Sequence, residues 1–427
     1  MRKIVLTALV VVGASFFVTW GALGSDTESD GQSEGNVETN EVIEQSFDVT
    51  GGVLLDFRGL RGSLVVRSGK PGQVSLSATK RARGADYEEA RRNLEKVKVD
   101  IKQSNNAIVI TGGAGSTGGW FRRPAANKYQ VDYDLTVQED IGVRVSDAEG
   151  SIRIADIRQG VNVVGTKVNA SFTNVQGGIS VRSETGSIRA SAADGDLRFE
   201  AKTAPVFVEK VSGPGLTINS GADITVRDAE IRGDLVIRAT SGNVIMQRLR
   251  ARTISADVRT GTTKITEATA DGTFTVLAND GKITVNRAQA ATFQATGGDI
   301  DLVEVQGGID LKTRAGKVNL RRVTPTLFRV AAGSGDVIFS GQLPDGGENS
   351  IRTSSGTISI FVSKESSLSL DASTETGSIT IDEQMPLEGG AQSDKLVRGA
   401  VNGGRASVVL ATASGNIEVG VGEPWWR

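Results

Sequence analysis

The chain has 427 residues, of which 38% are apolar and 23% are charged, a composition typical of a soluble globular protein with a large core. It contains no His and no Cys, which excludes Ser-His-Asp and Cys-His catalysis, zinc and haem sites built from these ligands, and disulfides. The net charge of -2 gives no general attraction to nucleic acid, so we expect no nucleic-acid partner.

The N-terminus has the pattern of an export signal. Arg2 and Lys3 precede an uncharged apolar run from Ile4 to Leu23, and small residues lie just before Ser25. This predicts a cleaved signal peptide at residues 1–24, although the run is also long enough to remain as a membrane anchor. Either outcome predicts export to the periplasm, cell surface or extracellular medium, with membrane contact only through residues 4–23.

Residues 25–45 are acidic and rich in Ser, Thr, Gly and Asn, with no Lys or Arg. Such a segment buries too little apolar surface to order itself, so it is predicted to be a disordered linker. Residues 46–145 contain short alternating runs such as 53–57 and 131–135, which are typical of strands. We expect this region to be a β-rich cap that covers the open edge of the following domain.

One short helix is predicted inside the cap. Asp86 is suited to the N-cap position, Glu89 follows three residues later as in a capping box, and Ala90 and Leu94 have helical spacing. Lys and Arg in this region alternate with acidic residues, which indicates a solvated face with ion pairs.

From residue 146 to 427 a short phrase recurs: Gly, one polar residue, then an apolar, a variable and an apolar residue. Examples are residues 150–154, 281–285 and 415–419. Repeats near 9 or near 17 to 20 residues indicate a coil with two main strands, and stacked coils form a parallel β-helix, or β-solenoid. Gly before each strand supplies a positive φ or a close approach between coils.

Within the phrase, the flanking residues are almost all aliphatic or Phe and should point inward. The residue between them is usually polar, as at Arg153, Thr284 and Asp301, and should point outward. Residues 383–404 break this rhythm with Pro386 and several Gly, and are predicted to be an exposed loop. The fold class is therefore all-β: a parallel β-solenoid with an N-terminal cap.

The chain resembles the bacterial putative-adhesin family, a β-strand-repeat domain of unknown function, over about residues 45–420. The resemblance rests on the Gly-Ser-Leu-Val-Val opening at Gly62, the basic run 78–83, the loop 120–123, and the repeated Ser-Gly-Asn-Ile and Thr-Gly-Ser-Ile units. It implies a right-handed β-helix-like solenoid exported to the cell envelope. It implies no particular ligand and no functional residues.

Two clusters are candidate sites. Trp120, Phe121, Arg122 and Arg123 form an aromatic and basic group after a Gly-rich stretch, and Trp and Arg are enriched where proteins bind partners. The alternative is that the aromatic rings pack on the cap. Asp299, Asp301 and Asp310 offer oxygens for weak Ca²⁺ binding, but outward residues that only solubilise a β surface are the favoured interpretation. The Gly-rich segments lack the ending of a phosphate loop, so no cofactor is expected.

The favoured function is that of an exported, non-enzymatic, adhesin-like binding or scaffold protein whose partner is a glycan or a surface protein. Ladders of outward side chains could make many weak contacts with a repetitive ligand. One alternative is a carbohydrate-active enzyme of the β-helix type that works with carboxylates alone. The other is a purely structural envelope protein.

Overall fold

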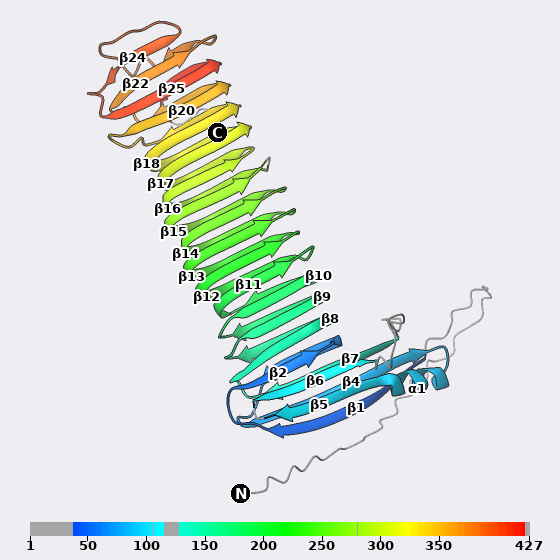
Figure 1. Ribbon diagram of the computed structural model, residues 1–427. Coiled ribbons are helices and arrows are strands. Elements are labelled where there is room, and N and C mark those ends of the chain that lie inside the picture. Colours follow the sequence, from blue (N-terminus) through cyan, green and yellow to red (C-terminus); the bar gives the residue numbers. More distant parts are fainter. Residues whose placement is uncertain (1–36, 105, 115–127, 280, 423–427) are drawn as a thin grey trace, which may run out of the picture. The chain divides into compact units, whose positions relative to one another are not determined.

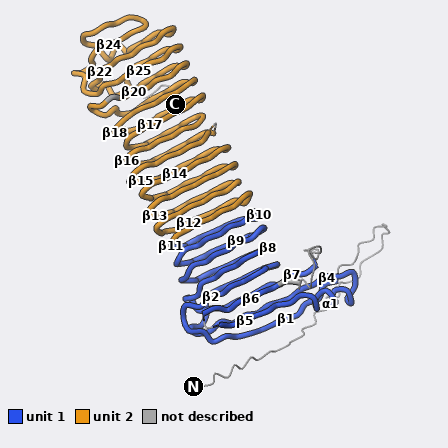
Figure 2. The backbone as a smooth tube through the Cα atoms, viewed as in Figure 1, with its two compact units in different colours: residues 1–194 blue, residues 195–427 orange. Residues whose placement is uncertain are grey.

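The computed structural model describes residues 37–104, 106–114, 128–279 and 281–422. The protein is nearly all-β, a β-solenoid of about 11 turns with one short helix near the N-terminus, as the sequence predicts (Figure 1). It divides into two compact units, which meet in sequence between Asp194 and Gly195 (Figure 2). The predicted signal segment lies outside the described residues. Within the described ranges no helix is long and apolar enough to cross a membrane.

Unit 1 opens with the cap, whose elements are β1 (Val37–Asp48), β2 (Val53–Arg58), β3 (Arg61–Ser68), β4 (Gln73–Gly84), α1 (Tyr87–Lys96), β5 (Val97–Ser104), β6 (Ala107–Ala114) and β7 (Tyr129–Val137). Strand β4 pairs antiparallel with both β1 and β7, and β5 pairs antiparallel with β6. Strands β2 and β3 instead run parallel to their neighbours. The cap is therefore a mixed sheet, not a regular part of the repeat.

The prediction of a disordered linker up to residue 45 is wrong for residues 37–45. They belong to β1, which pairs with β4 along its whole length. The acidic residues of β1 lie opposite a basic stretch of β4: Glu41 forms an ion pair with Lys80 at 2.6 Å, and Glu38 forms one with Arg83 at 2.8 Å. An acidic segment is disordered by itself, but here β4 supplies both a hydrogen-bonding edge and the opposite charge.

Helix α1 has the predicted start. The Asp86 side chain accepts a hydrogen bond from the Glu89 backbone N–H, and Ala90 and Leu94 are buried. The Glu89 carboxylate reaches back to the Ala85 N–H at 2.8 Å and forms an ion pair with Lys128 at 3.2 Å. The hydrogen bond from Ala85 and then the contact with Lys128 hold the pKa of Glu89 below its usual range. This is a variant of the capping box, in which the carboxylate bonds the N–H one residue before the N-cap and not that of Asp86 itself.

The solenoid of unit 1 continues with β8 (Ile141–Ile157), β9 (Val161–Val175) and β10 (Ile179–Ser191), which pair in parallel. The first half of β8 pairs with β2 and its second half pairs with β3. Strands β2 and β3 together therefore act as a first coil, which joins the cap to the repeat.

The short strand β11 (Asp194–Ala201) lies at the boundary between the units. In unit 2 the following coils are single long strands: β12 (Val206–Ser220), β13 (Ile224–Ala239), β14 (Val244–Val258), β15 (Thr263–Ala278), β16 (Ile283–Gly297), β17 (Ile300–Ala315) and β18 (Val318–Ser334). From β12 to β18 each strand pairs in parallel with the next. The two main strands predicted for each coil are thus one continuous strand that bends at a corner.

The corner is formed by a residue with a left-handed backbone, and in unit 2 this residue carries a charge. Its φ lies between 52° and 59° in seven consecutive coils: Lys210, Asp228, Arg248, Glu267, Arg287, Glu304 and Arg322. We call these residues the corner ladder. The strand registers place each opposite the next, so the sign of the charge alternates from coil to coil.

Ion pairs connect the corner ladder. Arg248 donates to the carboxylate of Asp228, Arg287 to that of Glu267, and Arg322 to that of Glu304. The hydrogen bond from Arg248 lowers the pKa of Asp228. Each exposed pair contributes little by itself, but a chain of alternating charges penalises any slip that brings like charges together.

We expect Glu267→Arg to lower the melting temperature by about 5 °C at low salt, because it creates three adjacent guanidinium groups in place of the Glu267–Arg287 ion pair and the longer-range attraction between Glu267 and Arg248. Arg already adopts this backbone conformation in the coils on both sides, so the substitution isolates charge from backbone strain. Thermal unfolding followed by circular dichroism should show the loss largely removed in 1 M salt. Glu375→Arg, at an exposed position away from the ladder, is the control. An equal loss in both variants would contradict a role for the ladder.

The C-terminal end contains β19 (Val337–Gly341), β20 (Glu348–Ser355), β21 (Ile358–Val362), β22 (Leu368–Thr374), β23 (Ile379–Ile381), β24 (Leu396–Val401), β25 (Ala406–Ser414) and β26 (Ile417–Val421). The last strands in sequence are not the last in space, because β25 lies between β20 and β22, and β26 lies between β21 and β23. Strand β24 then pairs antiparallel with β22 and interrupts the repeat at this edge.

Two expectations for this end need correction. The segment predicted to be an exposed loop, residues 383–404, contains β24, and its Met385 and Val397 are each only 2% exposed. The outward positions Ile338 and Ser359 are also buried, since every residue of β21 and nearly every residue of β19 is covered. Continuous apolar runs such as Val337–Phe339 are typical of strands buried on both faces, and alternation fails there for that reason.

Candidate functional site

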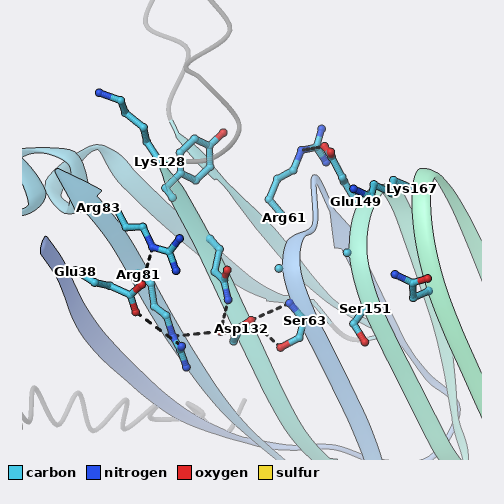
Figure 3. A pocket seen from close by; sticks show the side chains of 15 residues that line it. Glu38, Arg61, Ser63, Arg81, Arg83, Lys128, Asp132, Glu149, Ser151 and Lys167 are labelled. Carbon is cyan, nitrogen blue, oxygen red and sulfur yellow. Dashed lines mark hydrogen bonds and ion pairs between the residues drawn. The ribbon is translucent and has the colours of Figure 1, made fainter. Parts of the chain in front are cut away.

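The candidate site is a cleft of about 610 Å³ that lies wholly within unit 1 (Figure 3). This volume falls within the range of small-molecule sites in proteins. Its lining comes from the cap strands β1, β3, β4 and β7 and from the first coils β8 and β9. The cleft therefore forms where the mixed cap sheet continues into the regular repeat.

The floor is a row of short polar side chains on adjacent strands. Asp132 of β7 lies beside Ser63 of β3, Ser63 is in register with Ser151 of β8, and Ser151 is in register with Asn169 of β9. One position earlier, Gly62 and Gly150 are also in register, and a Cβ on Gly150 would lie 1.9 Å from the carbonyl oxygen of Gly62. Glycine is required there because neighbouring coils approach too closely for a side chain.

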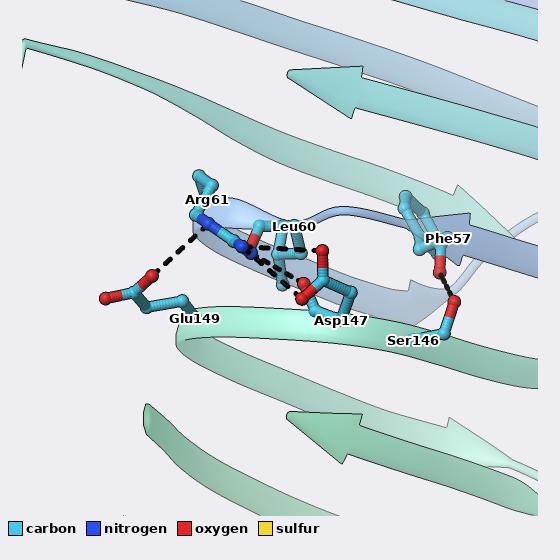
Figure 4. Close-up of polar contacts among 6 residues, drawn as sticks. All are labelled: Phe57, Leu60, Arg61, Ser146, Asp147 and Glu149. Carbon is cyan, nitrogen blue, oxygen red and sulfur yellow. Dashed lines mark hydrogen bonds and ion pairs between the residues drawn. The ribbon is translucent and has the colours of Figure 1, made fainter. Parts of the chain in front are cut away.

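Two residues before Ser63, Ser151 and Asn169, the same strand registers align a row of charged residues: Arg61, Glu149 and Lys167. Arg61 is held firmly (Figure 4): its Nε contacts Glu149 at 3.2 Å, and its Nη1 donates to the carbonyl oxygens of Leu60 at 3.0 Å and Asp147 at 2.6 Å. The guanidinium thus connects β3 to β8 and fixes one wall of the cleft.

Arg81 and Arg83 of β4 form the other wall, together with Glu38 of β1. Arg83 Nε contacts Glu38 at 2.8 Å, and Arg81 Nε contacts Asp132 at 3.3 Å. Asp132 also accepts hydrogen bonds from the backbone N–H and hydroxyl of Ser63 and from the amide of Gln130. The carboxylates of the cleft are consequently engaged as structural acceptors.

The charge balance of the lining is positive. Among the described residues, five cationic side chains and three carboxylates line the cleft; the cations are Arg61, Arg81, Arg83, Lys128 and Lys167, and the carboxylates are Glu38, Asp132 and Glu149. The protein as a whole carries a net charge of -2. The cleft is therefore a local cationic site, which attracts anionic groups.

None of the three predicted Asp residues lines this cleft. Trp120, Phe121, Arg122 and Arg123 lie outside the described residues. Asp301 points outward from β17 and forms an ion pair with Arg321 at 3.4 Å, while Asp299 accepts a hydrogen bond from the Lys317 N–H. Asp310 lies in a different row, opposite Arg329. Among the described residues, no group of three or more carboxylates is placed to hold a metal ion.

A sequence signal for the cleft exists in the strand phrase itself. The runs Arg61-Gly62-Ser63, Glu149-Gly150-Ser151 and Thr185-Gly186-Ser187 share a polar residue, Gly and Ser before an aliphatic residue. Aligning them would have predicted a Ser row beside a charged row. The basic residues of β4 carry no such signal, because an antiparallel cap strand brings them to the cleft.

Comparison with known proteins gives one family match: residues 223–420 match the Toastrack DUF4097 model. A crystal structure of a putative cell adhesion protein from Clostridium sporogenes is 9% identical, with 89% of this chain and 99% of that chain covered and a TM-score of 0.17. One of a putative adhesin from Bacteroides fragilis is 11% identical, with 66% and 96% covered and a TM-score of 0.22. No curated protein matches the chain. Residues 223–420 thus match a β-repeat domain family of unknown function, in agreement with the predicted resemblance over that range.

Proposed function

We propose that this protein is a non-enzymatic, adhesin-like β-solenoid that is exported and binds a repetitive partner, a glycan or a surface protein, at or beyond the cell envelope. The observation that carries the proposal is an uninterrupted row of outward side chains in unit 2, here called the central row: Thr217, Val236, Ser255, Thr275, Gln294, Asp310 and Arg329. Parallel pairing repeats these positions about every 4.8 Å.

Repetition is what makes such a surface useful for binding. A single Ser, Thr or Gln forms a weak contact with a hydroxyl or amide group. Several contacts at a fixed spacing act together, because the first contact raises the effective concentration of the next. The rigid coils hold the row in place, so little conformational entropy is lost on binding.

The proposal of a non-enzyme draws support from the carboxylates. An acid and base pair for glycoside hydrolysis requires one carboxyl group that stays protonated and a second that is free to act. In the cleft, Asp132, Glu38 and Glu149 each face an arginine instead. This arrangement favours binding over hydrolysis.

The test is binding of the purified full chain to glycan arrays and whole cells, with a parallel assay for polysaccharide depolymerisation. We expect saturable binding without product release. Thr275→Glu with Gln294→Glu should weaken binding at least about tenfold, since it places charge in the central row on two adjacent coils. The matched control is Thr266→Glu with Asn286→Glu, which replaces a Thr and a side-chain amide on the same coils in another row. Release of sugar products would favour a carbohydrate-active enzyme. An absence of both binding and product release in all assays would favour a purely structural protein.

A further inference from the structure

The cleft of unit 1 presents hydrogen-bond donors that the fold itself does not use. In the described part of the chain, the side chains of Lys167 and Ser151 make no hydrogen bond or ion pair with other residues. They lie on adjacent strands, and Ser151 is in register with Asn169, two residues after Lys167 and on the same face of β9. Asn169 accepts a hydrogen bond from Ser187 at 3.1 Å through its carbonyl oxygen, so its amide N–H groups remain available.

These donors lie beside a held cation. The Arg61 guanidinium is fixed by Glu149, by the Asp147 carboxylate at 3.4 Å and by two backbone carbonyl groups, and it occupies the same row of the sheet as Lys167. Its N–H groups are engaged within the fold, so it contributes positive charge beside Lys167 and not a free donor. Lysine, hydroxyl and amide donors around it complete a set suited to a carboxylate or a sulfate group.

The shape and the floor of the cleft restrict the ligand further. The floor crosses several strands as a row of neutral hydroxyl and amide groups, with Ser63, Ser151 and Asn169 in register. Such groups exchange hydrogen bonds with sugar hydroxyls, whereas a site for a lone inorganic anion would be small and closed. The half-buried ring of Tyr129 adds an apolar surface at the opposite wall.

We propose that this cleft binds an acidic oligosaccharide, one that carries carboxylate or sulfate groups on its sugar units. Lys167 binds the anionic group, the nearby charge of Arg61 adds to the attraction, and the row of Ser151 and Asn169 binds the neighbouring hydroxyls. Nucleic acid fits less well, because single strands are bound by stacking successive bases on aromatic side chains, and among the described residues of the lining Tyr129 is the single aromatic one. The inference does not depend on the central row of unit 2, which is a different surface.

The test is isothermal titration calorimetry of the full chain with five probes: a polygalacturonate fragment, a heparin fragment, a neutral glucan fragment of similar length, a DNA oligonucleotide and inorganic sulfate. We expect saturable binding of at least one acidic oligosaccharide, none of the neutral one, and an affinity that falls as salt is added. The two acidic probes distinguish carboxylate from sulfate recognition. Lys167→Glu should weaken binding by about tenfold or more, and Ser151→Ala by a few-fold.

The matched control is Lys364→Glu, which makes the same charge change at an exposed position in unit 2. It should alter the affinity by less than about twofold. An equal loss in Lys167→Glu and Lys364→Glu would overturn the proposal, and so would binding of inorganic sulfate alone or of a DNA oligonucleotide at equal affinity. Lys167→Glu should lose binding of acidic oligosaccharide but keep whole-cell binding if the latter depends on the central row of unit 2. The proposal for the cleft and the proposal for the central row can therefore fail separately.

Discussion

Gly335→Ala is expected to destabilise unit 2 by about 4 kcal/mol, because two costs combine at one residue. An added Cβ would lie 2.2 Å from the carbonyl oxygen of Gly316 on the preceding coil. The obstructing atom belongs to the backbone, so no rotamer change relieves the overlap and the two coils must separate. In addition, the φ of Gly335 is 127°, in a region that L side chains rarely adopt.

Gly389→Ala separates these two costs. Gly389 has a φ of 68°, and nothing lies within 4 Å of the position of an added Cβ. Its substitution should therefore show backbone strain alone, about 1 kcal/mol. Urea unfolding followed by circular dichroism measures both variants, and amide hydrogen exchange should locate the damage in β18 and β20, which pair just before Gly335 and Gly356. A loss in Gly335→Ala no larger than that in Gly389→Ala would show that the coils do not pack as closely as described.

The same glycine explains why so much of the fold could be predicted from the sequence. Gly335 is followed by the apolar, variable, apolar phrase, and the stacked glycines Gly316, Gly335 and Gly356 occupy the same place in successive coils. The phrase is short and local, so the period, the inward residues and the parallel pairing all follow from it. Helix α1 could be predicted for the same reason, since its capping residues lie within four positions of one another.

The features that sequence reasoning missed depend on contacts between distant residues. Glu38 of β1 forms its ion pair with Arg83 of β4, 45 positions away. Glu267 of the corner ladder meets its partner Arg287 on the next coil, 20 positions later. The cleft combines residues of the antiparallel cap, such as Arg81, with residues of the repeat, such as Lys167. No local window contains both partners, so charge patterns of this kind require the register of the strands before they can be interpreted.

Gly112→Ala is expected to destabilise the cap by about 3 kcal/mol, and Tyr133→Phe should restore most of that loss. An added Cβ at residue 112 would lie 2.1 Å from the Tyr133 hydroxyl oxygen, but 3.3 Å from the nearest ring carbon. The clash is therefore with one oxygen atom. Tyr133 is only 3% exposed and packs edge-on against Phe57 with ring centroids 5.6 Å apart, so the ring cannot swing away.

Tyr133→Phe should by itself be neutral or stabilising, by up to about 2 kcal/mol, because the hydroxyl is buried and has no hydrogen-bond partner in the described part of the chain. Burial raises the pKa of Tyr133 to about 12. In the unfolded chain the Tyr133 hydroxyl ionises near pH 10, whereas in the folded protein it keeps its proton up to about pH 12. Ionisation therefore favours the unfolded chain, and the free energy of unfolding falls as the pH rises from 10 to 12. Tyr133→Phe removes this contribution to the alkaline decline.

The clash and the pH effect are tested together by measuring free energies of unfolding at pH 8 and near pH 11. The proteins compared are the wild type, the two single variants and the double variant. We expect the double variant to be more stable than Gly112→Ala at either pH, with the advantage of Phe at residue 133 larger near pH 11. Additive losses in the double variant would mean that Gly112 is needed for the backbone of β6 and not for the Tyr133 hydroxyl. A destabilising Tyr133→Phe would mean that a buried water satisfies the hydroxyl, because only a bonded group loses free energy on removal.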